Sequence, residues 1–509
     1  MSAPARRTTV LVVGVSALLA AAVFVVVKDA LIDDAYITLA YAKNLAVHGQ
    51  WGLVPGMEAN SATSPLNVLL LGALTALTRV SGDPHPVVAL GVLTVLTTAV
   101  LGWAWTRLCR VYRLPWPVAL LGVLVVLANP FVLSAIGLEV LLIPAMLMLL
   151  TVFAAQGRPE WFGVAAGLAV LTRLDLVVFV LVIALCAGGI RRHIGKAALV
   201  GVAVSAPWFL FSWIALGSAV PDTLVIKQNQ DDLFGSWSYA TGPVMYYLGQ
   251  ELAVSMAFAP AVVGLIALCA LVGLWFARRW DRFPSVSALV GLGAGAVAYY
   301  LTYMVLGVGP YHWYYVAPTT ALGMFAVAIL GVWLVWARRE ATLRVHAPAA
   351  ALGVVAVFVF GAVAVDTGRD MPWRSPVIFG NWANAPDYAH VGLELGERAG
   401  DGTTVLSPGE IGALAYYCEC RIVDVFSDRG RVADLVNQRI AEAGPVGSAL
   451  LRLNYLFFDD VEPAKVDKRI RYTRGPGSGP DTWQVYSDAL GVGHFTLVDE
   501  PSEDSRPVE

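Results

Sequence analysis

The sequence predicts a polytopic α-helical membrane protein with a small α/β domain towards its C-terminal end. Of its 509 residues, 58% are hydrophobic and 14% are charged, and the mean hydropathy is +0.68. Soluble chains are typically about 45–50% apolar and about 25% charged, so a soluble enzyme of several domains is excluded. About half of the charged residues follow Asp366. We therefore expect a transmembrane domain at 1–366 and a water-soluble domain at 367–509.

Two further counts exclude other classes of protein. Five cysteines in so long a chain do not make a disulfide scaffold. The formal net charge of −3 gives no reason to expect a nucleic-acid partner.

The apolar segments define about eleven expected membrane spans. A spanning helix needs about 20 mainly apolar residues. The clear candidates are 8–27, 86–106, 114–133, 137–155, 196–216, 252–277, 285–306, 313–337 and 348–365.

Two segments are ambiguous by length. The segment 66–80 is apolar but short, whereas 161–189 is long for one span and carries Arg173 and Asp175 in its middle. Charges at that depth cost a few kcal/mol each unless they are paired. We expect 161–189 to form a hairpin of two short helices that turns at 172–175, and 66–80 to lie in the first outer loop, 28–85, without crossing.

The distribution of basic residues supports this choice, because cytoplasmic loops carry an excess of Lys and Arg. With Arg6 and Arg7 inside, most basic loop residues of the first 366 also fall inside. Those that fall outside are Lys28, Lys43, Arg79, Arg173 and Lys227. The sequence thus predicts a multi-pass plasma-membrane protein with a cytoplasmic N-terminus and an extracytoplasmic C-terminal domain.

The C-terminal domain shows an alternating pattern of short elements. We expect helices at 388–399, 409–417 and 431–443, and strands at 403–407, 421–426 and 455–459. This alternation is typical of an α/β layer. Cys418 and Cys420 are too close in sequence for a relaxed disulfide, and two cysteines alone do not form a zinc site, so we interpret them as structural residues.

The first outer loop holds the most informative residues, Asp33 and Asp34, which open an amphipathic stretch after the first span. Acids at a helix N-terminus can simply complement the helix dipole and cap exposed N–H groups. Alternatively, a carboxylate held at the membrane surface can accept a proton from an attacking hydroxyl, with its pKa tuned by burial and by the adjacent acid.

This loop resembles the first loop of the GT-C superfamily of membrane glycosyltransferases. The similar segments are DDAYITLAYAKNL at 33–45, GLVPG at 52–56 and ATSPL at 62–66. Further short segments continue the resemblance along most of the chain: GLE at 137–139, LTR at 171–173, PDT at 221–223 with Lys227, and GEIGA at 409–413. Within the superfamily, the chain looks most like the actinobacterial cell-wall arabinofuranosyltransferases.

The resemblance implies a GT-C-like fold with juxtamembrane helices in the first outer loop. It also implies transfer of a sugar, for which arabinofuranose is the suggestion, from a polyprenyl-phosphate donor. The acceptor would be a hydroxyl of a cell-envelope glycan, lipid or protein, in cell wall biogenesis. In the superfamily an aspartate of the first outer loop is the catalytic base, which here is Asp33 or Asp34. Direct displacement assisted by one base inverts the configuration of the sugar.

Other residues are assigned by position and charge. Two requirements of the reaction are a base and cations that steady the phosphate leaving group. We expect Arg173, Lys227 and His312 to bind the donor phosphate. The residues expected to contact acceptor or sugar are Lys43, Glu58, Ser64, Glu139, Asp222 and Tyr311. The partners are then the lipid-linked donor, the envelope acceptor and membrane lipid; we expect no cofactor and no required metal.

Alternatives stay open at several of these positions. Arg173 could instead pair with Asp175 or Glu139, and aromatic residues around His312 are usually interfacial anchors. Leu174 and Asp175 stand where such proteins often have a Pro-Glu pair, and Val140 stands where Thr or Ser is common. A lipid or solute transporter would predict mid-membrane acids and an internal repeat, and neither is evident. A non-catalytic assembly or scaffold protein remains an alternative.

Overall fold

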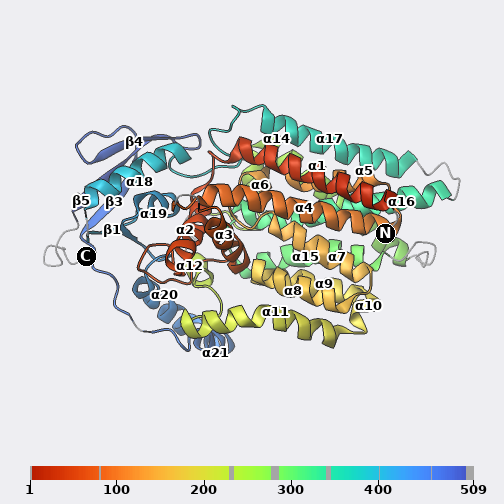
Figure 1. Ribbon diagram of the computed structural model, residues 1–509, viewed down its shortest axis with the longest axis horizontal. Coiled ribbons are helices and arrows are strands. Elements are labelled where there is room, and N and C mark those ends of the chain that lie inside the picture. The colour runs from red at the N-terminus through yellow and green to blue at the C-terminus, as the bar shows by residue number, and fades with distance from the viewer. Residues whose placement is uncertain are drawn as a thin grey trace. The chain divides into compact units, whose positions relative to one another are not determined.

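The computed structural model describes residues 3–79, 82–228, 234–276, 286–339, 346–400, 402–459 and 461–499. Helices dominate it, and a small sheet lies near the C-terminal end of the chain (Figure 1). The chain forms two compact units, which we call the helical unit and the mixed unit. The helical unit contains Met1–Val26, Gly91–Pro207 and Asp232–Met371. The mixed unit contains Val27–Leu90, Trp208–Asp231 and Pro372–Glu509.

The predicted division into 1–366 and 367–509 stays a prediction. The compact units group residues in another way, because the segment that contains the first loop shares a unit with the C-terminal part of the chain. Helices α1, α4 and α11 each begin in one unit and end in the other.

The helical unit is built from membrane-length helices and shorter apolar ones. Among the described residues, seven helices are long and apolar enough to cross a membrane. They include α1 (Ala3–Val27), α4 (Pro86–Tyr112), α11 (Ile194–Ala215), α14 (Glu251–Phe276), α15 (Ser287–Leu306), η4 with α16 (His312–Tyr315 and Val316–Arg339) and α17 (His346–Thr367). The shorter helices are α5 (Trp116–Leu127), α6 (Pro130–Leu133), α7 (Leu142–Ala155), α8 (Pro159–Thr172), α9 (Val177–Cys186), α10 (Gly188–Arg191) and α13 (Gly242–Gly249).

Small residues let these helices approach closely, as is usual between membrane helices. A Cβ added to Gly264 of α14 would lie 2.2 Å from the carbonyl oxygen of Leu322 in α16. One added to Gly291 of α15 would lie 2.8 Å from the Cα of Ile183 in α9. The fold class predicted from composition, a polytopic helical membrane protein with a small C-terminal domain, is confirmed.

The predicted hairpin at 161–189 is also confirmed. Helix α8 ends at Thr172, Arg173 adopts extended backbone with φ −158° and ψ 131°, and the short helix η1 (Leu174–Leu176) leads into α9. The ambiguous segment 66–80 contains α3 (Pro65–Leu77), which has 13 residues. At 1.5 Å per residue this helix is roughly 20 Å long, shorter than a hydrocarbon core of about 30 Å. Helices α5, α7, α8 and α9 are similarly short, with 10–14 residues, so the non-crossing position of 66–80 stays a prediction.

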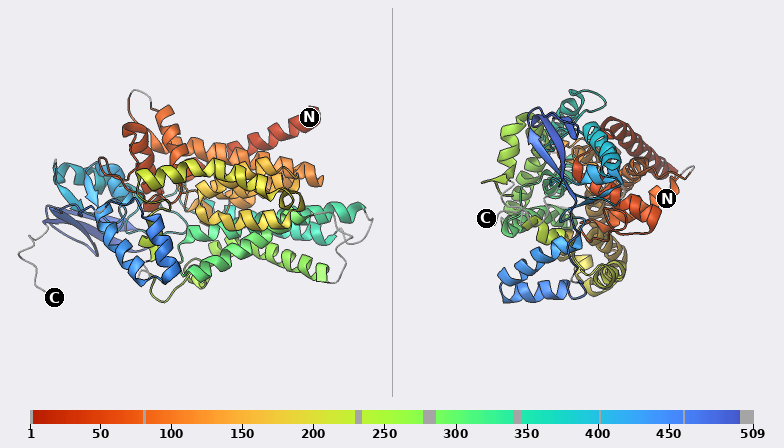
Figure 2. Two further views of the ribbon diagram at one scale, coloured as in Figure 1. Left: turned by 90° about the horizontal axis from the view of Figure 1, so that it is seen from below. Right: turned by 90° about the vertical axis from the view of Figure 1, so that its left-hand side faces the viewer.

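The mixed unit contains a five-stranded sheet in the order β2-β1-β3-β5-β4. Strand β1 (Thr404–Leu406) pairs in parallel with β2 (Arg421–Val423) and with β3 (Lys468–Arg474). Strand β5 (Gly491–Asp499) pairs antiparallel with β3 and with β4 (Thr482–Ser487). Figure 2 shows this sheet as blue arrows. The helices of this unit are α2 (Asp33–His48), α3, α12 (Thr223–Gln228), α18 (Ala385–Ala399), α19 (Gly412–Cys418), α20 (Arg429–Glu442) and α21 (Pro445–Asn454).

The strand predicted at 455–459 is wrong. Residues 445–454 form α21, and the chain then turns at 455–457. A short apolar run does not distinguish a strand from the end of a helix. Three strands that the sequence analysis did not identify, β3 to β5, complete the sheet instead.

The interpretation of the two cysteines of this unit is also corrected, since Cys418 and Cys420 form a disulfide. Glu419 between them has φ 50°, in the left-handed region. This turn at the end of α19 brings the two Cα atoms to 5.0 Å, within the usual range for a disulfide. An extended chain at this point would have kept them apart.

Candidate active site

Asp33 is fixed by the first turn of a different helix. Its Oδ1 accepts a hydrogen bond from the N–H of Ala413 at 2.7 Å, and its Oδ2 accepts one from the N–H of Gly412 at 3.0 Å. Its own N–H donates to Oδ1 of Asn381 at 3.2 Å. The N-cap residue of α2 is Ile32, whose side chain forms no capping hydrogen bond. The Asp33 carboxylate therefore caps α19, and not the helix that it opens, as the sequence analysis had considered.

Burial makes Asp33 a weak acid. The residue is only 4% exposed. Burial raises the pKa of Asp33 to about 7, and the neighbouring charges of Asp34 and Asp424 add to this, against the lowering effect of the two backbone N–H groups. A carboxyl group with a pKa near neutrality suits a general base, because it can both hold and release a proton at working pH.

Glu410 is a second, half-buried acid in the same unit, and the sequence analysis assigned it no role. It accepts a hydrogen bond from the N–H of Trp382 at 3.1 Å and another from the hydroxyl of Tyr388. Its pKa is raised by burial and then by the charge of Asp33. The signal that could have identified it is the GEIGA segment at 409–413, which also supplies the two N–H groups that hold Asp33.

Asp34 is more accessible than Asp33 and faces a cation. Its Oδ1 lies 3.6 Å from Nζ of Lys227, which belongs to α12. The side chain of Asp34 is 31% exposed and that of Lys227 is 13% exposed. The structure therefore brings Asp34 and Lys227 together, and their roles as base and phosphate-binding residue stay predictions.

Four other predicted residues of this unit have different surroundings. Lys43 forms an ion pair with Glu419 and lies over the ring of Tyr416, 5.2 Å from its centre. Glu58 is exposed in the loop after α2. Ser64 is buried at the start of α3, and its Oγ has no hydrogen-bond partner among the described residues.

The fourth, Asp222, is buried and joins two loops. Its Oδ1 accepts a hydrogen bond from the hydroxyl of Ser218 at 2.9 Å, and its N–H donates to the carbonyl oxygen of Asn60 at 2.8 Å. Burial raises the pKa of Asp222 to about 7. These contacts describe a structural role, and sugar contact by Lys43, Glu58, Ser64 or Asp222 stays a prediction.

In the helical unit, Arg173 is the centre of a buried ionic cluster. Its Nη1 donates to Oε1 of Glu139 at 2.6 Å, and its Nη2 donates to Oδ2 of Asp175 at 2.7 Å. Its Nη2 also donates to the hydroxyl oxygen of Tyr303 at 2.8 Å, and the guanidinium lies 5.1 Å from the ring centre of Tyr314. The ion-pair alternative is therefore present at both acids. The donor-phosphate role of Arg173 and the substrate role of Glu139 stay predictions.

His312 is buried rather than anchored at a surface. It is 6% exposed, and its Nε2 is buried without a hydrogen-bond partner among the described residues. Its ring lies 6.2 Å from that of Phe131 and 6.4 Å from that of Tyr246, between ring centres. Tyr311 is half-buried, with its ring centre 4.8 Å from that of Phe234. Phosphate or sugar contact by these two residues is not tested and stays a prediction.

Within the described residues, no group of three or more His, Cys, Asp or Glu side chains is placed to hold a metal ion. Metal independence stays a prediction. The arrangement in the mixed unit supplies a buried carboxyl of raised pKa, an accessible carboxylate and a lysine. Such groups can accept a proton and stabilise a developing negative charge.

The fold is shared with membrane enzymes of known structure. ArnT from Cupriavidus metallidurans in the apo state is 15% identical over 96% of this chain and 97% of its own, with a TM-score of 0.55. The same protein bound to undecaprenyl phosphate gives a TM-score of 0.54 at 15% identity and the same coverage. The Archaeoglobus fulgidus oligosaccharyltransferase in the apo form is 11% identical over 91% of this chain and 69% of its own, with a TM-score of 0.55.

At these identities the likeness shows the fold alone. No protein-family model matches the sequence. No curated protein matches it either.

Proposed function

We propose that this protein is an inverting glycosyltransferase that moves a sugar from a polyprenyl-phosphate donor to an acceptor hydroxyl, with Asp33 as the base. The observation that carries the proposal is the state of Asp33: a buried carboxyl, oriented by two backbone N–H groups, with a pKa of about 7. The shared fold with ArnT, which has been seen bound to undecaprenyl phosphate, supports a lipid-linked donor.

The reaction is a single displacement. The acceptor oxygen forms a bond to the anomeric carbon while the bond from that carbon to the phosphate oxygen breaks. The acceptor proton passes to Asp33, and polyprenyl phosphate leaves with the electron pair. Lys227 stabilises the negative charge of the leaving group, and Asp34 holds Lys227 in place through the ion pair.

The finer assignments rest on the sequence. The donor sugar is arabinofuranose and the acceptor is a cell-envelope glycan, lipid or protein, as in cell wall biogenesis of actinobacteria. The reaction takes place on the outer face of the plasma membrane. The N-terminus is cytoplasmic, and no metal or cofactor is required.

The test is a transfer assay with the purified full chain in lipid. A panel of polyprenyl-phosphate sugars and envelope acceptors is given to the wild type, Asp33→Asn and Asp34→Asn. Removing a general base typically costs about 10²–10⁴-fold in rate, so we expect that loss in Asp33→Asn. Asp34→Asn should keep measurable turnover, reduced because Lys227 loses its ion pair with the Asp34 carboxylate.

A pH profile separates the two aspartates. If Asp33 is the base it must be deprotonated, so the wild-type rate rises with pH through an apparent pKa near 7. Asp34 raises the pKa of Asp33, so Asp34→Asn should shift this rise to lower pH. Full activity in Asp33→Asn would exclude this mechanism, and loss in Asp34→Asn alone would transfer the role of base to Asp34.

A non-catalytic assembly protein is the second candidate, and one observation favours it. Both oxygens of Asp33 already accept hydrogen bonds from α19, as in a purely structural cap. That reading predicts that Asp33→Asn lowers the unfolding temperature and that no donor and acceptor pair of the panel is turned over by the wild type.

A further inference from the structure

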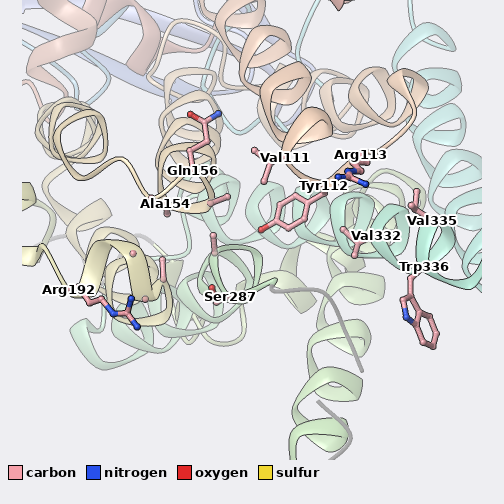
Figure 3. Close-up of a pocket in the computed structure, with 16 residues that line it drawn as sticks. Val111, Tyr112, Arg113, Ala154, Gln156, Arg192, Ser287, Val332, Val335 and Trp336 are labelled. Atoms are coloured by element: carbon pink, nitrogen blue, oxygen red, sulfur yellow. The ribbon is translucent and has the colours of Figure 1, made fainter. Parts of the chain in front are cut away.

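A cavity of about 780 Å³ lies in the helical unit, where several helices end together. Helix α4 ends at Tyr112, α7 ends at Ala155 and α15 begins at Ser287. The lining includes Tyr112 and Arg113 after α4, Gln156 after α7, Arg192 after α10 and Trp336 near the end of α16. In Figure 3, Arg113 and Arg192 lie on two sides of the pocket, with the ring of Tyr112 between them in this view.

The cavity is at the opposite end of the helices from the Arg173 cluster. Helix α8 begins with Pro159, three residues after the lining residue Gln156, and ends at Thr172, next to Arg173. The same holds for α15, which begins at the lining residue Ser287 and carries Tyr303 near its other end. The cavity is therefore separate from the cluster to which Arg173 belongs.

Positive charge collects around this cavity. Two smaller cavities, of about 390 and 320 Å³, share lining residues with it: the first shares Val111 and Gln156, and the second shares Arg113. Together the three are lined by five arginines: Arg107, Arg110, Arg113, Arg158 and Arg192.

For four of these arginines, no acid balances the charge in the part of the chain that the structure describes. There, Arg107, Arg113, Arg158 and Arg192 form no ion pair, and the nearby acid Glu160 pairs with Lys196. Loop arginines that only fix the topology need no cavity and can lie in solvent. Here Arg113, Arg158 and Arg192 are exposed to solvent, but they also line adjoining cavities.

Two buried polar atoms without partners and one unusual backbone conformation occur among the residues that line these cavities. Nε of Arg107 and Oε1 of Gln156 are buried without hydrogen-bond partners among the described residues. Arg113 has φ 57°, in the left-handed region that residues with a Cβ rarely adopt. Unsatisfied buried polar groups and strained residues concentrate at ligand sites.

We propose that this cavity binds the phosphate headgroup of an anionic lipid from the adjacent membrane leaflet. Arginine guanidinium groups donate paired N–H bonds to phosphate oxygens, and basic pockets between membrane helices bind anionic headgroups. The volume is within the range of about 300–1,000 Å³ for ligand sites. A lipid fits better than a soluble anion, because Val111, Val335 and Trp336 provide apolar walls for the glycerol and chain segments.

The experiment measures lipid binding to the full chain in detergent by native mass spectrometry. The probes are phosphatidylglycerol, phosphatidylcholine, undecaprenyl phosphate and inorganic phosphate. The variants are Arg113→Gln and Arg192→Gln. The matched control is Arg191→Gln, which removes the same charge from the neighbouring residue, outside the cavity lining.

We expect wild type to retain an anionic lipid in preference to phosphatidylcholine. Each of the two variants should bind it about tenfold more weakly, since a charge-assisted hydrogen bond is lost, while the control and the unfolding temperatures stay unchanged. A dependence on the two arginines seen only with undecaprenyl phosphate would identify the carrier lipid as the source of the phosphate.

Three results would overturn the proposal. They are equal retention of phosphatidylcholine, an equal loss in Arg191→Gln, and binding of inorganic phosphate as tight as that of the lipids. The experiment measures lipid binding, so its result tests this proposal whether or not the chain transfers a sugar.

Discussion

Arg173 and Asp33 illustrate two ways in which an ionisable side chain is kept in a buried position. Arg173 keeps its charge because Glu139 and Asp175 neutralise it and Tyr303 accepts a further hydrogen bond. Removing one partner of such a cluster typically lowers the free energy of unfolding by about 3–5 kcal/mol, because a charge is left buried and unpaired. Asp33 has only neutral N–H partners at its carboxylate, and burial raises its pKa instead.

The raised acid pKa values predict that the folded state is more stable at mildly acidic pH. Burial raises the pKa of Asp33, Asp222 and Asp424 to about 7 each, above the usual value near 3.8 for the unfolded chain. Between about pH 4 and 7 the unfolded state therefore binds fewer protons than the folded state. The contribution of these three groups to the free energy of unfolding is largest below about pH 4 and decreases as the pH rises to about 7.

Thermal unfolding of the full chain in detergent tests this prediction. The unfolding temperature should be higher at pH 5 than at pH 8, and Asp33→Asn should reduce the difference because the amide does not titrate. An unfolding temperature that rises from pH 5 to pH 8 would contradict it. Glu160→Gln serves as control, since that acid is exposed and forms an ion pair with Lys196.

At this scale the sequence could predict which residues matter better than what they contact. Asp33 and Asp34 were identified from their position after the first span, and the structure places Lys227 beside Asp34; the roles of all three stay predictions. The partners of Asp33 could not be predicted, because Gly412 and Ala413 are about 380 residues further along the chain. Only the folded chain brings a backbone N–H group to a distant carboxylate.

Among the secondary-structure elements, α2 and α19 depend on each other. The first turn of α19 holds the Asp33 carboxylate, and the ring of Tyr36 in α2 lies 5.4 Å from those of Tyr416 and Tyr417 in α19. A Cβ on Gly412 would lie 2.1 Å from the carbonyl oxygen of Asp33 and 2.9 Å from Cγ1 of Ile37. Glycine at this position is what lets the two helices meet.

We therefore expect Gly412→Ala to move the start of α2 away from α19. A displacement of this kind at a catalytic group can cost about 10²-fold in rate, and overpacking costs about 1–3 kcal/mol of stability. The transfer assay and thermal unfolding measure the two effects. Gly195→Ala is the control, since nothing lies within 4 Å of its added Cβ. A Gly412→Ala protein with wild-type rate and stability would show that the contact is not required.

Elements were predictable where the constraint is local and strong. The turn at 172–175 follows from the cost of placing Arg173 and Asp175 inside the bilayer, and the structure has it. Strand β3 is held by pairing with the more distant strands β1 and β5. Strands β4 and β5 form a local hairpin, which the sequence analysis missed. The left-handed turn at Glu419, which allows the disulfide, has no such local signal in its sequence.

For the whole molecule, the number of membrane crossings decides on which side each segment lies. The sequence analysis expects eleven crossings, which requires that the seven long helices and the shorter α5, α7, α8 and α9 all cross and that α3 does not. With the N-terminus inside, Glu58 then lies outside, Glu160 inside and Glu462 outside. If α3 also crosses, Glu58 stays outside but the other two exchange sides.

Cysteine labelling distinguishes these arrangements. Glu58→Cys, Glu160→Cys and Glu462→Cys are made one at a time in a chain without Cys109, Cys186 and Cys269, and intact cells are treated with an impermeant maleimide. All three positions are exposed, and acids contribute little to topology, so the substitutions should not alter it.

We expect Glu58→Cys and Glu462→Cys to react in intact cells and Glu160→Cys only after permeabilisation. Reaction of Glu58→Cys and Glu160→Cys, but not of Glu462→Cys, would show that α3 crosses. Reaction of Glu160→Cys alone would reverse the whole orientation and move Asp33 to the cytoplasmic side, where the proposed envelope acceptor is absent.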